Sequence, residues 1–195
     1  MSDKFFTVSK QSEGLYKEKG SKFVAYAFPV QSEEDIKYHL KQLKKEHYNA
    51  RHYCYAFIIG HPTPYFRAND DGEPNHSAGD PILRQIQSLN LTNTLVIVVR
   101  YFGGTKLGVS GLVNAYKTAA AEALQQNEII EKYLTVSTCF FYDYDQTNVV
   151  MKLVTEFNAE IFTQDFQARC KMEVKIKKSD FAAFIQALEK ANISI

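Results

Sequence analysis

An α+β protein of two domains is what this sequence of 195 residues predicts, with residues 1–131 in the first domain and 132–195 in the second. Strand-like and helix-like patterns alternate along the chain, and the pattern restarts around Glu131. The C-terminal segment has the predicted order βαββαβ, which is the ferredoxin-like arrangement. Each of the two segments is long enough to bury a core of its own.

The first domain begins with two predicted strands, residues 5–8 and 22–30, and we expect Gly14 and Gly20 to act as strand breakers between them. A helix follows because Ser32 is a favourable N-cap and the next three residues are acidic. The later elements are expected as strands at 53–59 and near 65–67, a helix capped by Asp80 with Pro81 in its first turn, a continuously apolar strand at 95–99, and a helix at 112–126.

The second domain is predicted to begin with a strand at 133–142 and a helix capped by Asp145. A hairpin of residues 160–165 and 168–176 follows, and its second strand alternates between apolar and charged side chains. The alternation places Met172, Val174 and Ile176 inward. The predicted domain ends with a helix capped by Ser179 and a strand at 193–195.

The charge balance excludes a globally basic nucleic-acid-binding protein. Lys and Arg number 23 and Asp and Glu number 22, so the formal net charge is +1 and any nucleic-acid site would have to be a local patch. The three cysteines form no CxxC pair, so we expect neither a zinc site nor a disulfide framework. We expect no cofactor and assign no metal ligand. No signal peptide or membrane-spanning run is recognisable, which leads us to expect a cytoplasmic protein without a membrane partner. The oligomeric state is left open.

The chemistry is concentrated in residues 70–111, where a basic, glycine-rich turn follows a hydrophobic strand. Its glycines would let backbone N–H groups approach an anion, and the following helix N-terminus adds positive potential. The spacing GGxxxGxxG matches neither established nucleotide-binding motif, and glycines that serve only tight turns remain an equal alternative. The residues concerned are Arg100, Gly103, Gly104, Lys106, Gly108 and Gly111.

An acidic turn precedes this strand and contains Asp70, Asp71, Glu73 and His76. These side chains could offer a hard-cation site or an acid/base pair. Alternatively, the turn is solvated and its carboxylates accept hydrogen bonds from backbone N–H groups, or it faces a substrate or partner. Because the sequence contains no nucleophile-elbow motif, we assign no catalytic residue and favour a protein that is not an enzyme.

The segments DDGEPNHSAGDPIL and RYFGGTKLGVSGLVNAY together resemble the signature of the IMPACT/YigZ family. The earlier segment GSKF at 20–23 and the Arg51-His52 step are similar to further blocks of that family, so the resemblance covers about residues 16–126. Residues 133–195 look like the additional C-terminal domain of bacterial members, a ferredoxin-like fold similar to domain V of elongation factor G. Where many members have a small residue after DDGEP and a threonine before AG, this chain has Asn75, His76 and Ser77.

The resemblance implies a first domain similar to the β-α-β sandwich fold shared by a ribosomal protein, elongation factor G and the GHMP kinases. It also implies binding to nucleic acid or to the translation apparatus. Eukaryotic members regulate translation through a separate RWD domain, for which this sequence shows no counterpart, so we do not expect that domain's partner.

Our leading hypothesis is a non-enzymatic binding module. A groove in its first domain would hold RNA, another polyanion, or part of the ribosome or a translation factor. The Phe102 ring would offer a surface on which a base could stack. The residues expected to bind are Lys22, Arg51, His52, Arg100, Tyr101, Gly103, Gly104, Lys106 and Gly108. The residues expected to order the loops or face the ligand are Asp70, Asp71, Glu73 and His76, and the acidic ones would do so by pairing with Arg51 or Arg100.

The competing hypothesis is a metal-assisted phosphoester hydrolase. Asp70, Asp71 and Glu73 would then be metal ligands, and His52 or His76 would be the acid/base group. A third hypothesis is protein docking through the lysine-rich face of the strand at 171–177.

Overall fold

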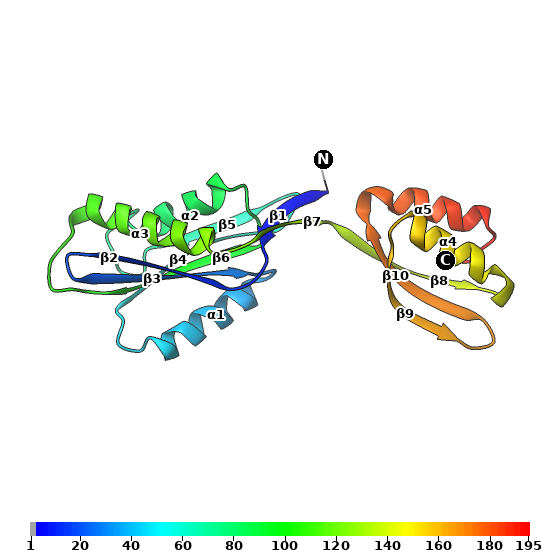
Figure 1. Ribbon diagram of the computed structural model, residues 1–195, viewed down its shortest axis with the longest axis horizontal. Coiled ribbons are helices and arrows are strands. Elements are labelled where there is room, and N and C mark those ends of the chain that lie inside the picture. The colour runs from blue at the N-terminus through cyan, green and yellow to red at the C-terminus, as the bar shows by residue number, and fades with distance from the viewer. Residues whose placement is uncertain (1–2) are drawn as a thin grey trace. The chain divides into compact units, whose positions relative to one another are not determined.

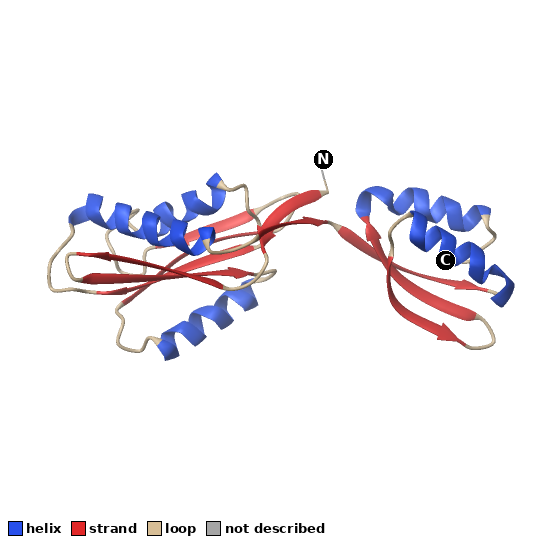
Figure 2. Cartoon of the chain, in the orientation of Figure 1, coloured by secondary structure: helices blue, strands red, loops and turns tan. Residues whose placement is uncertain are grey.

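The computed structural model describes residues 3–195 and is a mixed α/β structure (Figures 1 and 2). The chain divides into two compact units. One unit is Phe5–Lys132, and the other is Tyr133–Ile195 together with Asp3 and Lys4. No helix among the described residues is long and apolar enough to cross a membrane.

A five-stranded antiparallel sheet forms the centre of the Phe5–Lys132 unit, and β6 is its middle strand. On β6, Arg100 lies opposite Phe23 of one neighbouring strand and His52 of the other. In spatial order the strands are β2 (Ser12–Glu18), β3 (Ser21–Pro29), β6 (Thr94–Tyr101), β4 (His52–Ile59) and β5 (Tyr65–Asn69).

Helices cover both faces of this sheet (Figure 1). Helices α2 (Gly79–Ser88) and α3 (Gly108–Gln125) lie on one face, and α1 (Glu33–Glu46) lies on the other. Strand β6 is buried from Thr94 to Arg100, as its continuously apolar sequence predicts. Successive β6 side chains point to opposite faces of the sheet, so only every second residue of β6 can contribute to a site on one face.

Local signals correctly predict several elements of this unit. Ser32 caps α1 in a capping box, in which its side chain accepts from the Asp35 N–H and the Asp35 carboxylate accepts from the Ser32 N–H. The short strand expected near 65–67 is β5, at Tyr65–Asn69. For Gly14 and for the cap of α2, contacts with distant parts of the chain account for the wrong predictions.

Gly14 is not a strand breaker but lies inside β2. Helix α3 crosses this strand so closely that a Cβ atom on Gly14 would lie 2.3 Å from the backbone nitrogen of Ala123. The cap predicted for α2 is also wrong, because this helix begins at Gly79 and Asp80 is already in its first turn. Helix α3 begins at Gly108, four residues before the predicted start.

The Tyr133–Ile195 unit contains a three-stranded antiparallel sheet with the order β8-β10-β9. Met172, Val174 and Ile176 are buried in its core, as their alternation predicts. An antiparallel bridge joins Ser194 to Phe141 on β8. The elements are β8 (Thr135–Tyr142), α4 (Thr147–Glu156), β9 (Glu160–Phe166), β10 (Cys170–Lys177) and α5 (Lys178–Lys190).

The strand predicted at 133–142 is two strands, because Leu134 interrupts it. The Leu134 N–H donates to the Asp3 carbonyl and the Leu134 carbonyl accepts from the Lys178 N–H. The strand before this break, β7 (Ile129–Tyr133), pairs with β1 (Lys4–Val8).

Two predicted caps in the C-terminal unit are wrong as well. Asp145 lies within the 3-10 helix η1 (Tyr144–Gln146), and Asp143 caps this turn in its place. Ser179 lies inside α5, which begins one residue earlier and has Lys177 at its N-cap position.

Candidate functional site

A cavity of about 380 Å³ lies between the end of β6 and the N-terminus of α3. This volume is near the lower end of the range, roughly 300–1,000 Å³, that is usual for small-ligand sites. The cavity lies on the face of the sheet that α2 and α3 cover, and most of its wall comes from the predicted 70–111 segment. Its lining residues are Glu73, Pro74, Arg100, Phe102, Lys106, Leu107, Gly108, Val109 and Leu112.

Arg100 lines the cavity and is 5% exposed. Its guanidinium Cζ lies 5.4 Å from the Phe23 ring centroid and 5.6 Å from that of Phe102, within the range of cation–π attraction. Arg100 Nη1 donates to Glu73 Oε1 at 2.5 Å. Arg100 Nε has no hydrogen-bond partner among residues 3–195. A buried N–H group without an acceptor costs about 1–3 kcal/mol in stability. A ligand oxygen that accepted a hydrogen bond from Nε would remove this cost, which favours binding of the ligand.

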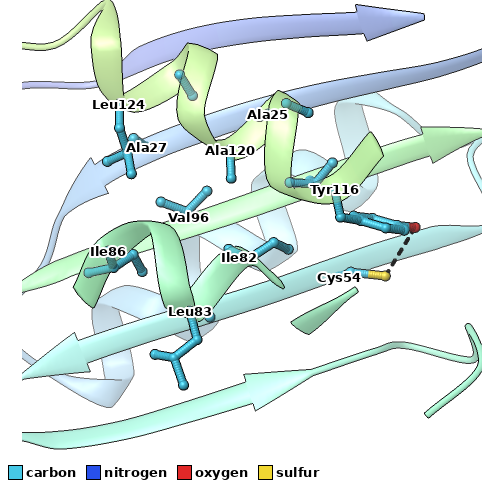
Figure 3. Close-up of a cluster of buried hydrophobic side chains, with 14 of the residues drawn as sticks. Ala25, Ala27, Cys54, Ile82, Leu83, Ile86, Val96, Tyr116, Ala120 and Leu124 are labelled. Atoms are coloured by element: carbon cyan, nitrogen blue, oxygen red, sulfur yellow. Dashed lines mark hydrogen bonds between the residues drawn. The ribbon is translucent and has the colours of Figure 1, made fainter. Parts of the chain in front are cut away.

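Glu73 joins Arg100 to a buried chain of polar side chains. Its Oε1 also accepts from the Tyr116 hydroxyl at 2.7 Å, and the Cys54 Sγ lies 3.3 Å from that hydroxyl (Figure 3). The Cys54 thiol also donates to the Asp70 carbonyl at 2.9 Å. Burial raises the pKa of both the Cys54 thiol and the Tyr116 hydroxyl. Both groups therefore stay protonated, and Cys54 is an inert structural thiol.

Asp70 organises the backbone around the start of α2. Its Oδ1 accepts from the N–H groups of Ala78 and Gly79 at 3.0 and 2.8 Å, and its Oδ2 accepts from the His76 N–H at 2.9 Å. Helix α2 has no cap from its own N-cap side chain, so this distant carboxylate takes that role. These three hydrogen bonds hold the backbone of residues 76–79 around the Asp70 carboxylate.

Asp71 connects the same turn to β4. Its Oδ2 accepts from the Tyr53 N–H at 2.7 Å, and its carbonyl oxygen is 2.9 Å from His52 Nδ1. His52 is thereby engaged by the loop and does not line the cavity. The exposed His76 ring pairs with Asp80 at 2.8 Å.

The hydrolase hypothesis required Asp70, Asp71 and Glu73 to converge on one metal ion. Their carboxylates instead accept hydrogen bonds from the α2 N-terminus, from β4 and from Arg100, respectively. Between residues 3 and 195, no group of three or more His, Cys, Asp or Glu side chains is placed to hold a metal ion. Asp70 and Asp71 thus match the alternative in which the carboxylates accept from backbone N–H groups, whereas Glu73 pairs with the side chains of Arg100 and Tyr116.

The structure does not bring all the predicted binding residues together. Tyr101 follows Arg100 on β6 and packs on the opposite face of the sheet, where its hydroxyl is 2.8 Å from His47 Nδ1. Lys22 lies on that face too, with its Nζ 6.0 Å from the Tyr101 ring centroid. Arg51 is exposed just before β4 and does not line the cavity. Of the basic residues that were predicted to line one groove, only Arg100 and Lys106 line this cavity.

The glycines of the basic turn have different roles. Gly103 packs against Gly20, since a Cβ atom on Gly103 would lie 1.9 Å from the Gly20 carbonyl carbon. Gly104 and Gly108 have φ angles of +87° and +75°, and a Cβ atom on either would meet no described atom within 4 Å. Gly103 is thus needed for packing, whereas Gly104 and Gly108 shape an open turn at the cavity.

Comparison with known proteins identifies the family. Residues 19–124 match the family model described as the Impact N-terminal domain. The chain belongs to the IMPACT family. An IMPACT family member of Haemophilus influenzae is 36% identical over 175 residues, which are 87% of this chain and 84% of that protein. YigZ of Escherichia coli is 30% identical over 168 residues, 85% of this chain and 82% of that protein. The chain is also similar to the crystal structure of a hypothetical protein. The match covers 100% of this chain and 97% of that protein's chain, with a TM-score of 0.74 and 26% identity.

The N-terminus of α3 adds positive potential to the cavity of this IMPACT family chain. Leu107 is its N-cap residue and makes no side-chain capping bond, and the first turn contains no acidic residue. The exposed Lys106 directly precedes this N-cap residue. The first N–H groups of a helix have no acceptor within the helix, so they attract an anion.

Sequence reasoning missed Phe23, Cys54 and Tyr116 as parts of the site. Tyr116 follows Leu112 by four residues, so its spacing marked it only as part of an apolar helix face. Its contact with Glu73 spans 43 positions of the sequence. Leu107 and Val109 were likewise invisible as cavity-lining residues, because only the start of α3 at Gly108 places them there.

Proposed function

We propose that this IMPACT family chain is a cytoplasmic, non-catalytic module that binds RNA or the translation machinery and takes part in translation regulation. One observation carries the proposal: Arg100, Lys106 and the uncapped N-terminus of α3 meet at a single cavity. The whole chain has a net charge of only +1, so this gathering of positive groups is local. A local positive site that is open to solvent is suited to the phosphates of a polyanion.

An aromatic side chain beside these groups supports RNA in particular. The Phe102 side chain is 49% exposed and lies against the Arg100 guanidinium. Proteins that bind single-stranded RNA combine basic groups with aromatic rings on which bases stack. Phe102 and Lys106 would supply these two elements within five residues of the chain.

The hydrogen bonds of the acidic turn favour a binding role over catalysis. The Asp70 and Asp71 carboxylates accept from backbone N–H groups, and the Glu73 carboxylate accepts from Arg100 and Tyr116. Groups that are held in this way order the loops around the cavity. We therefore assign the acidic turn a structural role and the basic turn a binding role.

We further propose that residues 1–131 form an IMPACT-type domain with the ribosomal-protein and GHMP-kinase type of β-α-β sandwich, and that residues 132–195 form a ferredoxin-like domain. The second assignment is supported by the sheet order β8-β10-β9 and by the antiparallel bridge from Ser194 to Phe141, which extends the sheet beyond β8. The order βαββαβ results when this last bridge is counted as a strand.

Salt-dependent binding tests the proposed function. The purified chain would be titrated with fluorescently labelled single-stranded RNA, and separately with ribosomes, at 50 and 200 mM salt. If about three phosphates are neutralised, the affinity for single-stranded RNA should fall roughly 20-fold over this range. Absence of salt-sensitive binding to both RNA and ribosomes would refute the proposal.

A further inference from the structure

We infer that the cavity at the N-terminus of α3 binds one nucleotide, with the phosphate at Lys106 and the helix N-terminus and the base against Phe102. The inference rests on the proposed function, since it names the unit of RNA that the site recognises. A free nucleoside monophosphate has the same chemistry, namely a phosphate joined through a ribose to a planar base that can stack. The experiment below separates these two sources.

Two independent features mark the phosphate end of the cavity. The first is α3 itself, a helix of 18 residues that begins without a side-chain cap, with Lys106 next to its N-cap residue Leu107. The second is Arg100, which is buried, lines the same cavity and has an Nε group without a hydrogen-bond partner in the described part of the chain. A phosphate oxygen is an acceptor that both the helix N–H groups and a guanidinium can bind.

The remaining wall is apolar and suits a base. Pro74, Leu107, Val109 and Leu112 line the cavity together with Phe102. Val109 is 57% exposed although its side chain is apolar. A base placed against these side chains would cover apolar surface that now faces water, and stacking on an aromatic ring contributes about 1–3 kcal/mol per base.

The negative charge in the cavity wall does not oppose this arrangement. Glu73 is the acidic lining residue, and its Oε1 is bound by both Arg100 and Tyr116. Lys106 is exposed and remains as the uncompensated charge of the wall. The charged side chains that line the cavity, Arg100 and Lys106 against Glu73, therefore sum to a charge of +1.

Phe102 has a second role in this arrangement. Arg100 Nε is buried, so an oxygen reaches it only after a neighbouring side chain moves. The Phe102 ring contacts the guanidinium and is half-exposed, which makes it the side chain best placed to move. We expect the ring to turn away from Arg100 and onto the bound base.

The test compares four probes and three variants. The chain would be titrated by NMR or calorimetry with UMP, with uridine and with inorganic phosphate, and then with single-stranded oligouridine. Phe102→Ala removes the stacking surface, and Lys106→Gln removes the charge. Lys41→Gln is the matched control, because Lys41 is an exposed lysine of α1, on the opposite face of the sheet.

We expect UMP to bind at least tenfold more tightly than uridine or phosphate. Phe102→Ala and Lys106→Gln should each weaken UMP binding about tenfold, the equivalent of 1.4 kcal/mol, and Lys41→Gln should leave it unchanged. Both substituted residues are exposed, so the thermal unfolding curves of the variants should match that of the wild type.

Four outcomes are informative. If uridine binds as tightly as UMP, or if neither cavity variant weakens UMP binding, the inference is overturned. If oligouridine binds but is equally insensitive to Phe102→Ala and Lys106→Gln, the inference is overturned while the proposed RNA-binding function stands. If UMP binds in the expected way but oligouridine and ribosomes do not, the nucleotide site stands for the free monophosphate and the proposed function fails. Equal weakening of both ligands by the two cavity variants supports both proposals.

Discussion

Replacing Glu73 by glutamine would test how much the buried pair with Arg100 stabilises the Phe5–Lys132 unit. The glutamine has nearly the same shape and can still accept from Tyr116, but it leaves the guanidinium charge unpaired. The two side chains of the pair are 6% and 5% exposed, so water cannot compensate for the loss. Breaking a buried pair by removing one partner costs about 3–5 kcal/mol, and we expect a destabilisation of that size.

A double-mutant cycle isolates the interaction between the two residues. Arg100→Met keeps the length of the side chain and removes the charge, and the double variant leaves no buried charge unpaired. We expect the double variant to be less destabilised than the sum of the two single variants, because two well-packed neutral side chains replace a desolvated ion pair.

Urea unfolding followed by two-dimensional NMR is the appropriate assay, because the chain has two compact units and a single global signal would mix their transitions. Resonances of β6 residues report on the unit that contains the pair. Arg169→Gln provides the comparison, since Arg169 and its partner Asp143 are 51% and 63% exposed and such a pair contributes less than about 1 kcal/mol. A loss below about 1 kcal/mol for Glu73→Gln would refute the reasoning, because the buried pair would then behave like an exposed one.

Three further predictions concern the loops and the buried hydroxyl. Asp70→Ala removes the acceptor of three backbone N–H groups and should destabilise the unit by about 2–4 kcal/mol, measured by urea unfolding. Gly103→Ala should destabilise it by more than about 3 kcal/mol because its Cβ would overlap the Gly20 backbone, whereas Gly104→Ala, which adds only positive-φ strain, should cost about 1 kcal/mol. Tyr116→Phe should change the pH dependence of stability. Burial raises the pKa of Tyr116 above its ordinary value of 10.0, so its contribution is complete below pH 10 and decreases above it by up to about 1.4 kcal/mol per pH unit.

Each of these predictions has an outcome that contradicts it. An Asp70→Asn variant that is as unstable as Asp70→Ala would mean that the lost charge, not the lost acceptor, dominates. Equal destabilisation by Gly103→Ala and Gly104→Ala would mean that backbone strain, not the close approach to Gly20, determines the role of Gly103. For Tyr116→Phe, an unfolding free energy that falls as steeply above pH 10 as that of the wild type would rule out a contribution from the hydroxyl's ionisation.

The sequence predicts best those elements whose causes are local. Ser32 and Asp35 lie within one turn of each other, so the capping box of α1 is visible in four residues. The continuous apolar run of β6 needs no partner to be recognised, because a strand covered on both faces has no polar side. The alternation of Met172, Val174 and Ile176 is also visible within a few residues, and it correctly predicted the buried face of β10.

Elements whose causes are distant could not be predicted in this way. As a glycine, Gly14 is expected to break a strand. Only the close passage of α3 over β2 explains why a glycine is needed within this strand. The cap of α2 comes from Asp70, through a turn in which Asp71, Gly72 and His76 all have positive φ angles. Tyr101 was assigned to the site because it neighbours Arg100 in sequence, although neighbouring strand residues point to opposite faces.

The two sides of the cavity differ in how firmly they are held. On one side, Asp70 and Asp71 fix the turn that carries Glu73 and Pro74 to α2 and to β4, so this side cannot shift without uncapping a helix. On the other side, Gly103 is held against Gly20, but residues 104–108 contain two glycines with open space around them. Fast backbone motion should therefore be confined to residues 104–108. Ligands of different size would be accommodated by a hinge-like adjustment of residues 104–108 against a fixed acidic turn.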